Sequence, residues 1–144
     1  KVFLLHGNHE SEALLKMLED VYGLKSIHGD YATFGDVGVF GCGGANVGPF
    51  PTSEQEIFDG LERGFQKIKN NPVKIMVPHA HPPGSTIEKF TNIFPGSIAV
   101  RKAIDHFKPD FLICGHVHEA QGIEETIGTT KVINVARTGK ILDV

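Results

Sequence analysis

The stretch FLICGHVHE, residues Phe111 to Glu119, joins a short apolar run directly to a glycine and two histidines. A similar order occurs in VFLLHGNHE, from Val2 to Glu10, and in KIMVPHAHPP, from Lys74 to Pro83. Short continuous apolar runs of this kind predict buried strands. We therefore expect three buried strands, Val2–Leu5, Lys74–Val77 and Phe111–Cys114, each ending in a loop that carries histidine.

Three helices are predicted between and beside these strands. The first covers Glu12–Tyr22, with Leu14, Leu18 and Val21 on one apolar stripe and Gly23 at its end. The second begins at a capping box, Ser53 with Glu56, and the third begins at Ser97. Their inward residues are expected to be Ile57, Leu61, Phe65 and Ile68 in the second helix and Val100, Ala103, Ile104 and Phe107 in the third.

The remaining segments predict an antiparallel patch, a long connection and a hairpin. Ser26–Gly44, rich in glycine and β-branched or aromatic residues, predicts two or three antiparallel strands. Gly84–Pro95 is expected to be irregular, and residues 122–136 form a hairpin that turns at Gly128-Thr129. The order of elements predicts an α/β or α+β fold with a partly parallel sheet, as one domain over residues 1–144. In such sheets ligands bind beyond the carboxyl ends of the strands, where all three histidine loops lie.

Composition indicates a soluble globular protein. The chain has 144 residues, 40% hydrophobic and 22% charged, and a net charge of −3, so it has no general positive field for nucleic acid. No apolar run approaches the ~18 residues of a membrane span, and no signal-peptide pattern opens the chain. Cys42 and Cys114 are expected to be small buried residues rather than a disulfide framework, which favours a cytoplasmic location.

The three loops together offer seven candidate functional side chains: Asn8, His9, Glu10, His79, His81, His116 and His118. Imidazole nitrogens combined with amide or carboxylate oxygens suit first-row divalent ions such as Mn, Fe, Ni and Zn. Gly7 and Gly115 each precede a candidate ligand and permit a sharp turn or a close approach. Two ions about 3.5–4 Å apart would suit in-line displacement at phosphorus.

The motifs GNHE (residues 7–10), PHAHPP (78–83) and GHVH (115–118) resemble those of the calcineurin-like metallophosphoesterase family, in the same order and with similar spacing. That family's blocks are D-x-H, G-D-x-x, G-N-H-(D/E), a strand ending in His, and G-H-x-H. The resemblance covers essentially the whole chain. It implies a β-sandwich of mixed sheets flanked by helices, and metal-dependent hydrolysis of phosphomonoesters or phosphodiesters at two divalent ions.

The resemblance also implies a role for each matching residue. Asn8, His79 and His116 would bind the second ion, and His118 would bind the first. His9 would bind no metal; it would contact the phosphate and protonate the leaving group as a general acid. A small phosphorylated substrate is expected, with nucleotides among the candidates, while the substrate, metal identity and oligomeric state stay open.

The sequence departs from the family pattern at three places. The D-x-H and G-D-x-x blocks would lie upstream of Lys1, so the chain resembles the C-terminal portion of the full domain, and the fragment alone is expected to be weak or inactive. The middle block holds both His79 and His81; His79, nearer the strand, is favoured as the ligand. The usual Asn-Pro-Gly-Ser after the hairpin is replaced by residues 134–137, Asn-Val-Ala-Arg.

Other readings stay open at this point. The chain would alternatively be a catalytically degenerate family member that serves as a protein-interaction scaffold, or a mononuclear metal-binding module. Glu10 is read as a first-turn carboxylate or a group that supports a ligand. His6, His28 and His106 are read as structural: near the motif, in a turn and on a helix face.

Overall fold

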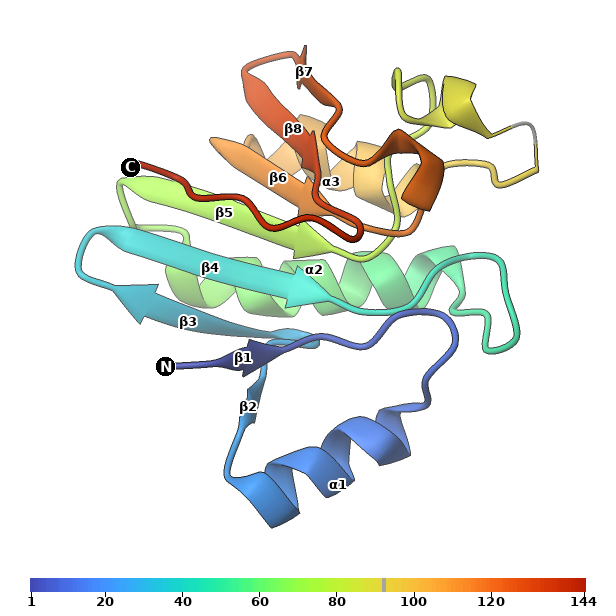
Figure 1. The fold of residues 1–144 in the computed structure, drawn as a ribbon. Helices are drawn as coiled ribbons and strands as arrows, with labels where there is room; N and C mark the ends of the chain where they lie inside the picture. The colour runs from blue at the N-terminus through green and yellow to red at the C-terminus, as the bar shows by residue number, and fades with distance from the viewer. Residues whose placement is uncertain (92) are drawn as a thin grey trace.

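The computed structural model describes residues 1–91 and 93–144; Asn92, inside the connection expected over Gly84–Pro95, lies outside the described residues. Figure 1 shows the arrangement of the helices and strands. The helices are α1 (Glu12–Tyr22), α2 (Glu54–Ile68) and α3 (Ile98–Phe107), with 3-10 turns at Glu88–Phe90 and His118–Ala120. The strands are β1 (Phe3–Leu4), β2 (Lys25–Ser26), β3 (Asp30–Phe34), β4 (Val37–Cys42), β5 (Val73–Pro78), β6 (Phe111–Cys114), β7 (Glu124–Ile127) and β8 (Thr130–Asn134).

Six strands form one mixed sheet in the order β3-β4-β5-β6-β8-β7. The four central strands, β4, β5, β6 and β8, run parallel, and antiparallel β3 and β7 occupy the edges. This confirms the α/β prediction of a partly parallel sheet, and the hairpin turns at Gly128-Thr129 as expected. Because the central strands are parallel, the loops after β4, β5 and β6 leave the same edge of the sheet (Figure 1).

Within Ser26–Gly44, β3 and β4 are antiparallel, which confirms the prediction of two or three antiparallel strands. Strand β2, at the start of this segment, has a pairing that was not predicted: it lies parallel to β1 in a separate two-stranded sheet. The reason is topological: β1 leads through helix α1 into β2, and a strand that returns after a crossover helix lies parallel to the first. This pairing places the residues that follow β1 beside those that follow β2.

The main core lies between the six-stranded sheet and helices α2 and α3. Phe40, Met76 and Leu112 are neighbours across three strands and are fully buried on this face. The predicted inward residues of both helices pack against them, and the rings of Phe65 and Phe107 stack with centroids 4.4 Å apart. The predicted caps are present, since Ser53 with Glu56 forms the capping box and the Ser97 side chain accepts from the backbone of the third helix's first turn.

Helix α1 packs differently from the prediction. Leu15 is its buried residue, whereas Leu14 and Val21 of the predicted stripe are 41% and 65% exposed. The helix contacts β2 and stands apart from the six-stranded sheet (Figure 1). Its ends are as predicted, because Ser11 caps the start and Gly23 takes a left-handed conformation at φ 64°.

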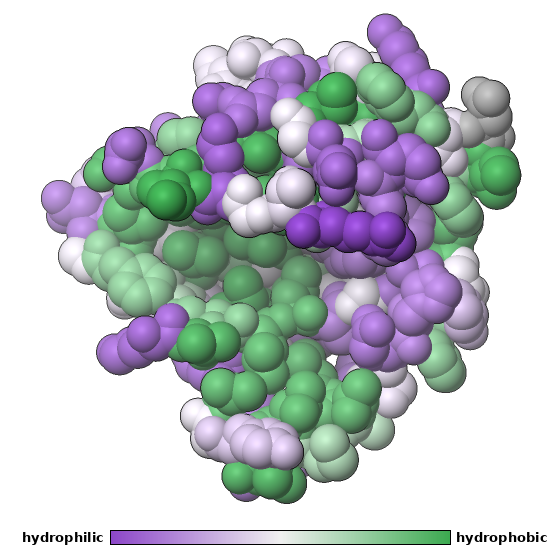
Figure 2. All heavy atoms as spheres, viewed as in Figure 1, coloured by the Kyte–Doolittle hydropathy of each residue, from purple (hydrophilic) through white to green (hydrophobic). Residues whose placement is uncertain are grey.

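The face of the six-stranded sheet opposite α2 and α3 is also apolar. Val39, Ile75 and Phe111 are register neighbours on it. Figure 2, viewed from this side, shows apolar side chains gathered in a broad hollow across the middle of the molecule. No helix among the described residues is long and apolar enough to cross a membrane.

Helix α2 approaches the sheet closely at Gly64. A Cβ on this residue would lie 2.7 Å from the Asp30 carbonyl oxygen and 2.9 Å from the Phe40 Cβ. Alanine favours helix by about 1 kcal/mol, but here the clash with backbone dominates. We expect Gly64→Ala to reduce the free energy of unfolding by about 1–3 kcal/mol, measured by urea denaturation. Glu62→Ala, exposed on the same helix, is the control and should change it by less than about 0.5 kcal/mol.

Candidate functional site

The three histidine loops converge on one pocket at the carboxyl edge of the sheet. The pocket has a volume of about 580 Å³. It is lined by Gly7, Asn8, His9, Glu10, Gly48, Pro49, His79, Phe94, His116, His118 and Glu119. All five residues assigned to metal or catalysis from the sequence therefore line the same cavity, together with Phe94 and two glutamates.

Asn8 is held with its side-chain oxygen facing the pocket residues. Its Nδ2 donates to the Val47 carbonyl at 3.1 Å, which leaves Oδ1 directed at His79 Nε2, also at 3.1 Å. The backbone carbonyl of Asn8 accepts the Phe50 N–H at 3.2 Å. Because both ends of the amide are placed by protein contacts, Oδ1 is fixed without help from solvent.

His79 and His116 lie against each other across the ends of β5 and β6. His116 Nδ1 is 3.3 Å from His79 Nε2, and the rings meet edge to face with centroids 5.2 Å apart. The His79 carbonyl accepts the backbone N–H groups of both Gly115 and His116 at 3.2 and 3.1 Å. Phe94 packs against the His116 ring with centroids 5.3 Å apart, which shields this side of the pocket.

Burial keeps these imidazoles neutral. Desolvation, followed by the nearby His116, lowers the pKa of His79 to about 4. Burial likewise lowers the pKa of His116, with His118 and His9 adding to the effect. A neutral imidazole has a free lone pair at neutral pH, which is the form that binds metal.

The separations fit a bound divalent ion. Asn8 Oδ1, His79 Nε2 and His116 Nδ1 are consecutive neighbours at 3.1 and 3.3 Å. Two ligands at bond lengths of about 2.0–2.2 Å around one tetrahedral or octahedral ion lie about 3.0–3.5 Å apart. Each of these two neighbouring pairs is therefore already spaced as adjacent ligands, and an oxygen with two nitrogens suits Mn, Fe, Co, Ni or Zn.

The other two predicted residues lie at the open side of the pocket. His9 and His118 are exposed, and both contribute to the lowered pKa values of His79 and His116. The carboxylates that line the pocket are Glu10 and Glu119. Glu10 Oε2 accepts the Gly7 N–H at 2.9 Å, so this side chain closes the loop that carries Asn8 and His9.

His81 is placed apart from this set. Its side chain is 1% exposed, is not among the pocket-lining residues, and neither ring nitrogen has a hydrogen-bond partner among the described residues. Burial lowers the pKa of His81 to about 4, so the ring is neutral. Its ring lies nearly parallel to that of His116 with centroids 6.2 Å apart.

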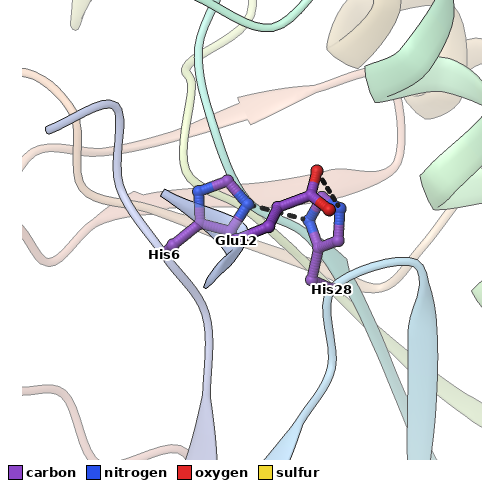
Figure 3. A group of neighbouring side chains, drawn as sticks. All are labelled: His6, Glu12 and His28. Carbon is purple, nitrogen blue, oxygen red and sulfur yellow. Dashed lines mark hydrogen bonds and ion pairs between the residues drawn. The ribbon is translucent and has the colours of Figure 1, made fainter. Parts of the chain in front are cut away.

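A second group of potential ligands was missed from the sequence. His6, Glu12 and His28 bring their ligand atoms within 4.8 Å of one another (Figure 3). Burial first, then His6, lowers the pKa of His28. The sequence reasoning assigned both histidines to structure, because the spacing between them carries no motif. A parallel pairing of β1 with β2 would have revealed the group, since one histidine follows each strand.

The altered segment after the hairpin has a visible consequence. Ala136 has a φ of 36°, in the left-handed region that favours glycine, at the position where the family pattern has glycine. Asn134, which the pattern keeps, donates from Nδ2 to the Val117 carbonyl at 2.7 Å. This contact supports the loop between His116 and His118.

Comparison with known proteins identifies the family. The sequence profile described as calcineurin-like phosphoesterase matches residues 1–120. The chain belongs to the calcineurin-like phosphoesterase family. Over 109 residues it is 35% identical to a protein of Methanocaldococcus jannaschii named "Uncharacterized protein MJ1162", and the match covers 69% of this chain and 48% of that protein. The chain thus spans about half the length of this relative.

Solved structures support the same fold. The crystal structure of TT1561 of Thermus thermophilus superposes with a TM-score of 0.69 at 17% identity, over 93% of this chain and 62% of that one. A second crystal structure gives the same TM-score at 19% identity, over 93% of this chain and 56% of that one. The family membership predicted from GNHE and GHVH is therefore confirmed.

The contacts distinguish His79 from His81 as a metal ligand. We expect His79→Ala to weaken Mn²⁺ or Zn²⁺ binding at this pocket by at least about 100-fold, because it removes the central one of three ligand atoms. His81→Ala should leave metal affinity within about threefold, although it opens a small cavity. Isothermal titration with metal-free protein measures both. An equal loss in the two variants would contradict the assignment.

Glu88 fastens the loop that carries Phe94. Its two carboxylate oxygens accept the Gly84 and Gly96 N–H groups at 2.7 and 2.8 Å, and these bonds, Gly96 first, lower the pKa of Glu88. Because the pKa of Glu88 is lowered on folding, its carboxylate stabilises the fold at pH values above the ordinary pKa of 4.5. This contribution to stability is lost as pH falls through the pKa of the folded state.

We therefore expect Glu88→Gln to lower the melting temperature by a few degrees at pH 7. The difference from the unmodified protein should shrink as pH falls below about 4.5, where the carboxyl of the unfolded chain binds a proton, and should disappear below the lowered pKa of the native carboxyl. Thermal melts followed by circular dichroism across pH 3–8 measure this. Glu62→Gln, exposed on α2, is the matched control, and a difference that persists unchanged at pH 3 would refute the carboxylate's role.

Proposed function

We propose that this calcineurin-like phosphoesterase hydrolyses phosphomonoesters or phosphodiesters at a dinuclear divalent metal centre in the pocket. The observation that carries the proposal is the convergence of Asn8 Oδ1, His79 Nε2 and His116 Nδ1 at adjacent-ligand spacing. These three residues would hold one ion, and His118 would contribute to the other. When bound, the ions supply charge neutralisation at the phosphoryl group and an activated water nucleophile.

The chain's own residues divide the remaining tasks. His9, exposed at the rim beside Asn8, donates a proton to the leaving oxygen and contacts the phosphate. Phe94 and Pro49 form apolar parts of the wall, where the ester group of a small substrate would rest. The loop closed by Glu10 keeps His9 and Asn8 in fixed relative positions, so that the proton donor and the metal ligand face the same substrate.

The first ion, the one assigned to His118, lacks most of its proposed ligands in residues 1–144. His118 is the proposed ligand for it, and the pocket's carboxylates are Glu10 and Glu119. The family's D-x-H and G-D-x-x blocks supply the others. We propose that the 144-residue chain binds one ion tightly in this pocket and is weak or inactive by itself, and that a longer chain carrying those blocks binds two there. For the count below, both proteins carry His28→Gln, so that the separate group of His6, Glu12 and His28 adds no ion.

The direct test combines metal content with hydrolysis. The 144-residue protein and a longer chain with the two upstream blocks are stripped of metal, equilibrated with Mn²⁺ or Zn²⁺, and measured by elemental analysis. Both are then tested on p-nitrophenyl phosphate and bis-p-nitrophenyl phosphate. About two ions with metal-dependent turnover in the longer chain supports the proposal. Metal binding without any turnover would favour the metal-binding module, and no metal at all would favour the scaffold reading.

His9 should be separable from the metal ligands. We expect His9→Gln to reduce kcat by about 10²–10⁴-fold on an alkyl phosphate, whose poor leaving group needs a proton. The loss should be much smaller on p-nitrophenyl phosphate, which leaves readily as an anion, and metal content should not change. His106→Gln, on the exposed face of α3, is the control. Equal losses on both substrates would exclude the general-acid role.

A further inference from the structure

A second set of nitrogen lone pairs converges outside the pocket, at residues His6 and His28, which do not line it. His6 Nε2 lies 3.2 Å from His28 Nδ1, and His28 Nε2 lies 3.5 Å from Glu12 Oε1 (Figure 3). We propose that His6 and His28 bind a further divalent cation of the Zn²⁺ type, with Glu12 supporting His28 and water completing the coordination. This site is separate from the phosphoesterase centre and does not depend on the proposed activity.

The hydrogen bonds of His6 fix which nitrogen is free. Its Nδ1 is 2.8 Å from the Gly7 carbonyl oxygen, an atom that only accepts, so Nδ1 carries the proton. Nε2 of a neutral His6 is therefore a lone pair, and it points at His28. A backbone carbonyl on the far nitrogen is the usual support of a metal-binding histidine.

The contacts of His28 indicate the opposite tautomer from that of His6. The Gly43 N–H donates to Nδ1 at 3.0 Å, so Nδ1 is a lone pair and Nε2 carries the proton that faces Glu12. A carboxylate on the far nitrogen of a histidine is the carboxylate–histidine–metal arrangement. Two lone pairs thus face each other at 3.2 Å, a repulsive contact that a cation between them would turn into an attractive one.

The spacing suits two ligands of one ion. At bond lengths of about 2.0–2.1 Å, two imidazole nitrogens around a tetrahedral ion lie about 3.3 Å apart. The ion would compete with the Gly43 N–H for the lone pair of His28, and one hydrogen bond is worth far less than a bond to a divalent cation. The Cys42 sulfur, 3.9 Å from the same nitrogen, is buried, and burial raises the pKa of its thiol to about 12.

The surroundings favour a cation and admit water. His6 is 7% exposed, whereas the Glu12 side chain is 73% exposed, so the cluster is closed on one side and open on the other. The open side leads into a hollow of about 300 Å³. Its wall carries three carboxylates and one guanidinium: Glu12, Glu56, Asp59 and Arg63, with His28 and Thr52.

The test must separate this ion from the one in the phosphoesterase centre. Metal-free protein carrying His79→Ala and His116→Ala is titrated with Zn²⁺ by calorimetry. We expect one Zn²⁺ per chain to remain bound. Adding His28→Gln should weaken that binding by at least about 100-fold, and adding Glu12→Gln by about 10–100-fold. His106→Gln, an exposed histidine on α3, is the matched control and should not change it.

A second measurement keeps the test decisive if the multiple variants fold poorly. Glu12 is exposed, so Glu12→Gln alone can be made in the otherwise unmodified protein. Nitrogen NMR of the histidine rings should show Zn²⁺ shifting His6 Nε2 and His28 Nδ1, and this shift should require a higher Zn²⁺ concentration in Glu12→Gln. No stoichiometric Zn²⁺ in the first titration, or spectra in which a proton shared between His6 and His28 persists in saturating Zn²⁺, would overturn the proposal.

Discussion

The backbone of His79 holds the candidate site together. Its N–H donates to the Cys42 carbonyl at 3.2 Å, and its carbonyl accepts from Gly115 and His116. The parallel ladder thus continues past the ends of β4, β5 and β6 into their loops. The same continuation joins the His6 carbonyl to the Gly44 N–H on one side. Side chains that are far apart in sequence are therefore fixed to within a hydrogen bond of one another by backbone contacts, before any metal contributes.

This dependence explains what the sequence could and could not predict. Phe111–Cys114 and Glu12–Tyr22 were predictable to the residue, because periodicity and capping are local signals. Asn8, His79 and His116 were predictable as a group because parallel strands bring their carboxyl ends to one edge. The pairing of β2 with β1 is a lateral contact without a local signal, so it was not predicted, and the cluster that it creates at His28 was missed.

Three of the histidines in and beside the pocket are held in the neutral form. Several imidazoles lie in and beside one pocket, and burial with mutual repulsion keeps His79, His81 and His116 uncharged. Charged imidazoles at this density would repel one another in a poorly solvated space. Neutral histidines avoid that cost, but they bring no negative charge to balance divalent ions. A dinuclear centre therefore needs carboxylates in addition to what Glu10 and Glu119 supply at the rim.

The loop from His6 to Glu12 belongs to both ligand sets. Asn8 faces His79 on one side, and His6 with Glu12 faces His28 on the other. Backbone contacts already hold this connection, since the His6 carbonyl accepts the Gly44 N–H and the Asn8 carbonyl accepts the Phe50 N–H, each at 3.2 Å. An ion bound by His6 and His28 would therefore not need to rearrange Asn8. Because coupling between sites requires that one ligand change the state seen by the other, we expect the two sites to bind metal independently.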